Sequence, residues 1–188
     1  MGFKNARLPL FIGSRISLGI MEETDVTNRM VGWICDEEVN RYLAHKTASK
    51  KCFMEWVRSK DESEKALLFL ITLNESQRPI GMIKLEHWDN RKQIAEMGSC
   101  IDIALIIGEK DCWGKGLMAE AMNLLIDYSF NQLNLNTVYL GVAADNTRAV
   151  RLYHRLGFIE FHRDENGWEH TEPICDHIWM KKDRVLGI

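Results

Sequence analysis

The sequence lacks the features that divide a chain into separate units: it has no proline-, glycine- or serine-rich linker, no low-complexity tract and no internal repeat. Its 188 residues are 46% apolar and 27% charged, which allows one domain to bury a substantial core. Two domains of ordinary size would be cramped in this length. We therefore expect residues 1–188 to form a single domain.

The sequence also lacks the run of about 18 apolar residues that a membrane-spanning helix requires. The early segment LPLFIG is shorter than the apolar part of a signal peptide, and no small-residue cleavage pattern follows it. A net charge of −3 and a pI near 6.1 give no sign of the basic surface that nucleic-acid binders usually carry. These absences predict a cytoplasmic protein whose partner is neither a membrane nor a nucleic acid.

Paired cysteine motifs are absent as well. The five cysteines are odd in number and no two are spaced as CxxC, so we expect reduced thiols. His170, Cys175 and His177 lie close together in the sequence, but no second pair with zinc-site spacing accompanies them. The sequence therefore predicts no bound metal.

The apolar periodicity indicates a domain of the α/β class. Strands are predicted at residues 15–20, 66–73, 80–87, 101–107, 138–142, 158–163 and 174–180, and helices at 26–34, at 49–59, from Leu117 onward and from Asn146 to Gly157. A turn at 74–79 makes the second and third strands a hairpin. Asn166-Gly167 is a strong hairpin signal and predicts the turn between the last two strands.

Residues 101–142 form the centre of this prediction. The run 101–107 is apolar except for Asp102, as expected of a strand covered on both faces. A tight loop, a helix and a second buried strand follow it, and such a unit makes its two strands parallel through a right-handed crossover. We predict a mixed central sheet with one parallel βαβ connection, flanked by helices.

The loop WGKGLM, residues 113–118, is the first candidate binding site. Gly114 and Gly116 let the backbone bend and approach a ligand, and the free N–H groups at the helix start point outward with the positive end of the helix dipole. This arrangement suits a phosphate, and Lys115 adds a positive charge. The spacing is neither that of a P-loop nor GxGxxG, and Gly-rich turns without a ligand are common, so the loop alone favours such a turn slightly over a phosphate site.

Two longer runs carry a family resemblance. IDIALIIGEKDCWGKGLMAEA and LNTVYLGVAADNTRAVRLYHRLGF, together about residues 101–158, resemble the acetyl-CoA-binding core of the GNAT superfamily of N-acetyltransferases. In detail they are similar to its ribosomal-protein, spermidine and nucleotide-amino-sugar branch. The resemblance implies an acyltransferase that moves acetyl from acetyl-CoA to a primary amine by direct transfer in a ternary complex.

The resemblance also implies the residues that hold acetyl-CoA. The pyrophosphate is expected on the backbone N–H groups of the loop, and the pantetheine arm beside the end of the central strand. Trp113 stands where Gln or Arg is frequent in the family, and Met118 where Gly or Ala is usual. The expected cofactor-binding residues are Leu105, Ile106, Ile107, Trp113, Gly114, Lys115, Gly116, Leu117, Met118 and Asn146.

Two residues are the expected catalytic groups. The resemblance implies that Tyr153 protonates the departing thiolate of CoA; judged without it, Tyr153 is a core aromatic residue and Asn146 a helix cap. Asp102 lies near the position where related enzymes place an acidic residue that accepts the amine proton. Its alternative is a solvated charge at a strand end, and the competing bases are Glu86, His87 and Glu96.

The acceptor pocket is expected to include Tyr42, Glu86 and His87, with His45 and Trp88 as further candidates. We expect a small-molecule amine as the acceptor, in particular an amino sugar carried on a nucleotide. A protein N-terminus is the alternative substrate, and a non-catalytic CoA-binding regulatory module is the alternative class. The sequence does not fix the oligomeric state, and a homodimer is compatible with it.

Overall fold

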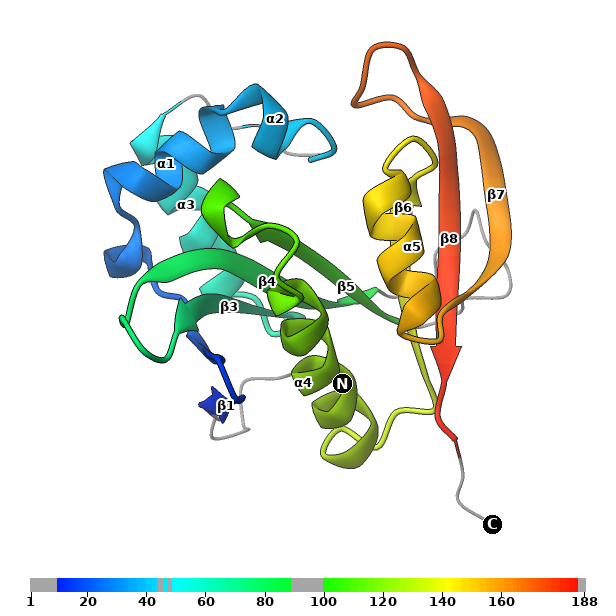
Figure 1. Cartoon of the computed structure of the whole chain (residues 1–188), viewed down its shortest axis with the longest axis horizontal. Helices are drawn as coiled ribbons and strands as arrows, with labels where there is room; N and C mark the ends of the chain where they lie inside the picture. The colour runs from blue at the N-terminus through cyan, green and yellow to red at the C-terminus, as the bar shows by residue number, and fades with distance from the viewer. Residues whose placement is uncertain (1–9, 44–45, 47–48, 89–99, 186–188) are drawn as a thin grey trace.

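The computed structural model describes residues 10–43, 46, 49–88 and 100–185, and all structural statements below refer to these. One mixed sheet of eight strands runs through them in the order β1-β2-β3-β4-β5-β6-β8-β7 (Figure 1). The strands are β1 (Phe11–Ile12), β2 (Ile16–Ile20), β3 (Ala66–Leu73), β4 (Pro79–Trp88), β5 (Cys100–Ile107), β6 (Thr137–Ala143), β7 (Ile159–Trp168) and β8 (Cys175–Asp183). The helices are α1 (Asn28–Cys35), α2 (Glu37–Asn40), α3 (Lys50–Asp61), α4 (Leu117–Asn131) and α5 (Thr147–Arg155).

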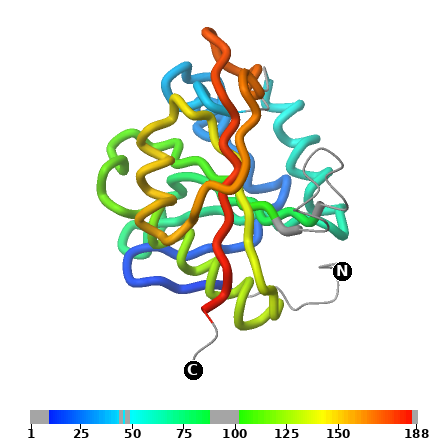
Figure 2. The backbone as a smooth tube through the Cα atoms, turned by 90° about the vertical axis from the view of Figure 1, so that its right-hand side faces the viewer, coloured from blue at the N-terminus to red at the C-terminus, as the bar shows by residue number. Residues whose placement is uncertain are grey.

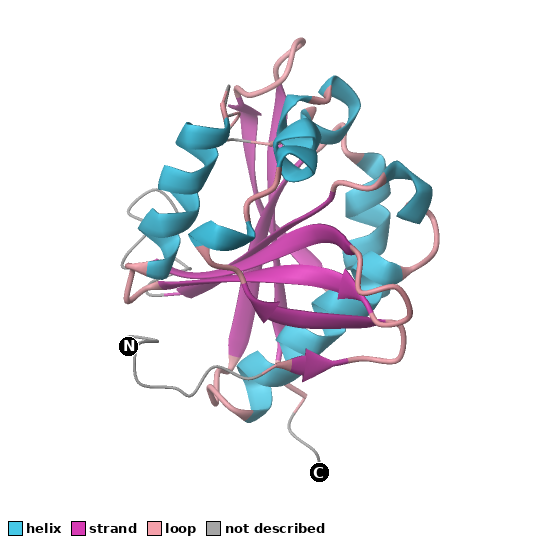
Figure 3. Cartoon of the chain, turned by 90° about the vertical axis from the view of Figure 1, so that its left-hand side faces the viewer, coloured by secondary structure: helices cyan, strands magenta, loops and turns pink. Residues whose placement is uncertain are grey.

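Helices cover both faces of the sheet (Figure 3). Because strand side chains alternate between faces, β3 sends Leu67, Phe69 and Ile71 into the larger core beneath α4 and α5, and Leu68 into the smaller core beneath α1 and α3. This double cover explains why the central strands are apolar along nearly their whole length. No helix among the described residues is long and apolar enough to cross a membrane.

The central parallel connection is confirmed. β5 and β6 are parallel neighbours joined by α4, and every other neighbouring pair in the sheet is antiparallel. β4 and β5 pair over eight positions, whereas β5 and β6 meet at one, Asp102 with Tyr139. The two strands therefore separate after Asp102, and their carboxyl ends lie apart (Figure 1).

The predicted position of the last hairpin turn was wrong. β7 and β8 do form an antiparallel hairpin (Figure 2), but Trp168, after Asn166-Gly167, still pairs with Cys175, and the connection is residues 169–174. Asn166 has the left-handed φ of 51° that a hairpin turn would use, yet here it sits at a register shift inside β7. The Asn-Gly pair thus supplies a bulge instead of the turn, because both elements need the same left-handed backbone.

Candidate active site

A cavity of about 410 Å³ occupies the separation between β5 and β6. Residues 102–106 of β5 and 141–143 of β6 all line it. Consecutive strand residues point to opposite faces, so a cavity lined by five of them in a row runs along the strand edge. The cavity is therefore open to the backbone of β5 itself.

The backbone of Leu105 faces this cavity. Gly108 donates its N–H to Ile80 of β4, whereas the carbonyl of Ile107 turns the other way and accepts from Trp113 Nε1 at 2.8 Å. Backbone groups of alternate strand residues point to the same side, so Leu105 directs its N–H and C=O away from β4, as Ile107 does. An extended ligand arm can pair with the strand at this edge.

The loop before α4 has the geometry that a pyrophosphate requires. Gly114 and Gly116 both have φ of +75°, which L side chains rarely adopt, and a Cβ on Gly114 would meet nothing within 4 Å. Gly116 is the N-cap of α4 and no side chain caps the helix. The first N–H groups of α4 lack intrahelical partners, so the loop fits a phosphate group there.

Two anchors hold this loop at its ends, and sequence reasoning did not find either. Arg15 donates from Nη1 to the Lys115 carbonyl at 2.7 Å and from Nε to Glu120 at 2.8 Å. At the other end Glu109, itself buried, accepts from Arg29 at 2.6 Å and from Trp33 Nε1 at 2.7 Å. Partners so distant in the sequence leave no local signal.

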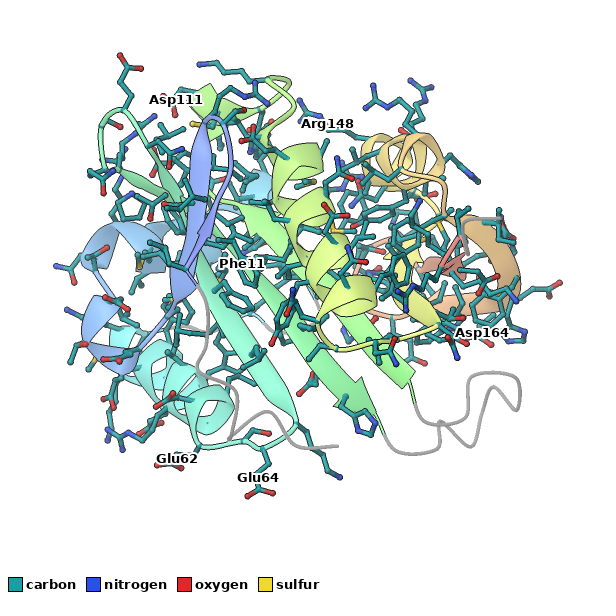
Figure 4. The ribbon with its side chains drawn as sticks, turned by 90° about the horizontal axis from the view of Figure 1, so that it is seen from below. Phe11, Glu62, Glu64, Asp111, Arg148 and Asp164 are labelled. Carbon is teal, nitrogen blue, oxygen red and sulfur yellow. The ribbon has the colours of Figure 1, made fainter. Side chains whose placement is uncertain are left out.

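The two departures from the family pattern have structural explanations. Trp113 is tied to Ile107 through its ring nitrogen, and the guanidinium of Arg148 lies 5.1 Å from the centre of its ring. Figure 4 places Arg148, at the start of α5, on the same side of the molecule as Asp111 of this loop. Met118 is partly buried and packs against the larger core. Both side chains leave the α4 N-terminus intact.

Asp102 and Tyr153 line the same cavity, Asp102 from β5 and Tyr153 from α5. Asp102 is 8% exposed and Tyr153 7%, so Asp102 is not a solvated strand-end charge. Burial, and then the charge of Asp102, raises the pKa of the Tyr153 phenol well above its ordinary value. The phenol therefore keeps its proton near neutral pH, and the same rise in pKa makes it a weaker acid than an exposed tyrosine.

Asn146 and Tyr42 also line the cavity. Asn146 caps α5, since its side-chain oxygen accepts from the Ala149 N–H at 3.2 Å. Tyr42, just after α2, donates its hydroxyl to the Asp145 carbonyl at 3.1 Å. This bond joins the first half of the chain to the loop before α5, across the separation between β5 and β6.

Glu86 and His87 do not line the cavity. Burial alone would raise the pKa of Glu86, but hydrogen bonds from Lys60, at 2.7 Å, and Lys84 outweigh it and lower the pKa. His87 follows Glu86 in β4 and so faces the opposite side of the sheet. Of the other candidates, His45 and Glu96 lie outside the described residues, as does the side chain of Trp88.

Aromatic residues that sequence reasoning missed form one wall of the cavity: Trp168, His170, His177 and Trp179. The sequence singled out His170 and His177 only as metal candidates. Among the residues that the structure describes, no group of three or more His, Cys, Asp or Glu side chains is placed to hold a metal. Alternation along β8, which puts His177 and Trp179 on one face, was the available signal.

The fold is an α/β fold with a cavity between two parting parallel strands. A family model described as "Acetyltransferase (GNAT) domain" matches residues 15–159. The chain belongs to this family, as the resemblance predicted, and is an acetyl-CoA-dependent N-acetyltransferase.

Individual relatives agree with the family. The uncharacterized N-acetyltransferase p20 of Bacillus licheniformis is 28% identical over 148 residues, 77% of this chain and 79% of that protein. A spermidine N(1)-acetyltransferase of Vibrio cholerae is 49% identical over 47 residues, 25% of this chain and 27% of that protein. The crystal structure of spermidine N-acetyltransferase from Vibrio cholerae, in complex with CoA and spermine, has a TM-score of 0.76 at 23% identity and covers 91% of this chain and 96% of its own.

Proposed function

We propose that this protein transfers the acetyl group of acetyl-CoA directly to the primary amine of a small molecule while both substrates are bound. One observation carries the proposal: Asp102 and Tyr153 line a single cavity that also exposes the edge of β5. A volume of about 410 Å³ lies within the range of small-molecule sites.

The side chains supply the two proton transfers that the reaction needs. Acetyl-CoA brings an activated thioester. A primary amine is mostly protonated near neutral pH, so Asp102 takes its proton, directly or through a water, and frees the nitrogen lone pair. As the new N–C bond forms and the C–S bond breaks, Tyr153 donates its phenolic proton to the departing sulfur. The Leu105 N–H stabilises the negative charge that develops on the acetyl oxygen.

The acceptor is the finer part of the proposal, with an amino sugar carried on a nucleotide as the specific expectation. Tyr42 lines the cavity and donates a hydrogen bond to Asp145 in the loop before α5, and this link supports a small acceptor over an extended peptide. A protein N-terminus remains the second substrate class, because a putative ribosomal N-acetyltransferase of Bacillus subtilis is 33% identical over 87 residues.

Release of the CoA thiol across a panel of acceptors tests this function. The panel contains nucleotide amino sugars, polyamines, aminoglycosides and N-terminal peptides, each with acetyl-CoA. We expect one small-molecule class to accelerate thiol release well above the rate without acceptor. Preference for N-terminal peptides would contradict the acceptor class. Tight acetyl-CoA binding without release for any acceptor would indicate a regulatory module instead.

A further inference from the structure

The aromatic wall of the cavity, made of Trp168, His170, His177 and Trp179, has no part in the proton transfers above. The rings of Trp168 and His177 are 4.8 Å apart at 82°, and those of His177 and Trp179 are 4.1 Å apart at 33°. His170 meets Trp168 edge-on at 5.5 Å. The rings thus form a corner, with Trp179 packed behind His177.

The corner is held in place before any ligand arrives. Trp179 donates its Nε1 to Asp164 at 2.7 Å, which fixes the indole at the back of the corner. His177 lies over Gly141 of β6, where an added Cβ would stand 2.3 Å from its Nε2. A residue larger than glycine would push the imidazole from its place. The absence of a side chain at Gly141 is what lets the ring settle against the sheet.

Other residues that line the cavity are also apolar or aromatic. Phe53 and Trp56 of α3 line it, with Leu43 and Tyr42. Among the described lining residues, Asp102 contributes one negative charge and Lys84 one positive charge. Such a lining suits one ammonium group on an uncharged body better than a chain with several ammonium groups.

We propose that the acceptor is a monoamine whose amino group is carried by a ring, and that the ring packs into the aromatic corner while the amine reaches toward Asp102. This inference rests on the proposed function and names its substrate class. An arene or a pyranose would fit equally, because both present a flat apolar face to an aromatic side chain.

Calorimetric binding to the CoA-loaded protein tests the proposal without requiring acetyl transfer. The probes are 2-phenylethylamine and glucosamine as ring-bearing amines, n-octylamine as an open-chain monoamine, and spermidine as a polyamine. The variants are Trp168→Leu and Trp168→Phe. The indole nitrogen of Trp168 has no hydrogen-bond partner among the described residues, so leucine leaves no polar group newly orphaned. Ile174→Ser, at an exposed position in the connection that follows β7, is the control.

We expect Trp168→Leu to weaken binding of a ring-bearing amine by about 3- to 30-fold, the range of an aromatic contact. Trp168→Phe should weaken binding of the ring-bearing amine less, and Ile174→Ser should not weaken it. The affinity for n-octylamine should change by less than about 2-fold in Trp168→Leu. If Trp168→Leu weakens the binding of glucosamine, the corner accepts a pyranose. If it weakens the binding of 2-phenylethylamine, the corner accepts an arene. Equal losses for n-octylamine, tighter binding of spermidine than of either ring amine, or no measurable ring-amine binding would overturn the proposal.

The failure of this proposal and that of the proposed function are distinguishable. If acetyl transfer is found but favours polyamines, the ring-bearing acceptor is wrong and the enzyme stands. If ring-bearing amines bind through Trp168 but thiol is never released, the corner is a binding site and the transfer is wrong.

Discussion

Tyr153 packs in the core and is the proposed proton donor, and substitution can separate the two roles. Its ring centre lies 6.0 Å from that of Phe158 in the larger core, while the side chain also lines the cavity. The position of Tyr153 is therefore compatible with both roles, that of a core aromatic residue and that of a general acid. Packing needs only the ring, whereas proton donation needs the hydroxyl.

Replacing Tyr153 by Phe should lower kcat by roughly 10- to 300-fold with little change in acetyl-CoA affinity. The ring that packs the core is kept, and a thiolate with a conjugate-acid pKa of about 8.5 is a tolerable leaving group, so the loss is moderate. Steady-state kinetics and calorimetry on the same preparation measure both quantities. Turnover equal to that of the unmodified protein would leave Tyr153 as a core residue only.

Asp102→Asn should reduce activity most at low pH and be partly rescued at high pH. The reason is that the amine then loses its proton to the solvent, and the missing base matters less. The measurement is kcat/KM against pH for both proteins with one acceptor. If the shape of the profile is unchanged, water or another group accepts the proton of the amine, and Asp102 is not the base.

Which polar residues share the cavity was only partly predictable. Asp102, Tyr153, Asn146 and Tyr42 line it, and no local signal in β4 tells that Glu86 and His87 do not. β4 is paired on both sides, so its adjacent residues face opposite sides of the sheet and at most one of that pair was able to reach the site. Two lysines, one of them 26 residues away, then occupy the carboxylate of Glu86.

At the scale of elements, the loop before α4 is where sequence reasoning succeeded best. Its glycines have the positive φ expected of them, and α4 begins at Leu117 as its periodicity predicted. The ion pairs that anchor the loop were not predictable, since Arg15 and Glu120 are 105 positions apart in the sequence and Arg29 and Glu109 are 80 apart. The two-residue strand β1 and the single-turn helix α2 were also missed, because such short elements have no readable period.

Gly116→Glu should abolish acetyl-CoA binding in a folded protein, since a carboxylate would meet the pyrophosphate. Gly116→Ala is the matched control: it carries the same backbone strain at φ +75°, and its Cβ would meet only Arg15 at 3.6 Å. We expect the alanine variant to bind measurably and the glutamate variant not to bind. Similar affinities of the two variants by calorimetry would remove the pyrophosphate from this loop.

Glu109→Gln tests the anchor at the start of the loop through its pH dependence. The hydrogen bond from Arg29, followed by that from Trp33, lowers the pKa of Glu109 against the opposing effect of burial. A lowered folded-state pKa stabilises the fold above the ordinary value of 4.5, and this contribution is lost as the pH falls through the lowered pKa.

The variant should therefore be less stable than the unmodified protein near neutral pH, by about 1 kcal/mol because Arg29 is half-exposed. This difference should shrink as the pH falls below 4.5. Chemical denaturation of both proteins at several pH values measures it. A difference that stays constant into the acid range would show that the charge of Glu109 is not what anchors the loop.

At the scale of the whole molecule, the parallel pair at the centre of the sheet was predictable, whereas its pairing at a single position was not. Apolar runs and one helical crossover were enough to predict a mixed sheet with a parallel pair at its centre. That β5 and β6 pair only at Asp102 and Tyr139 is a property of the assembled sheet, and no local pattern in either strand signals it. The aromatic corner depends on that separation and so was hidden as well.

The most direct test of the account is the initial rate of thiol release measured while acetyl-CoA and an active acceptor are varied together. Both substrates are proposed to occupy one cavity at the same time, so double-reciprocal plots should give intersecting lines. The protein should also keep its unmodified mass after incubation with acetyl-CoA alone. Parallel lines together with an acetylated protein would contradict direct transfer and indicate an acyl-enzyme.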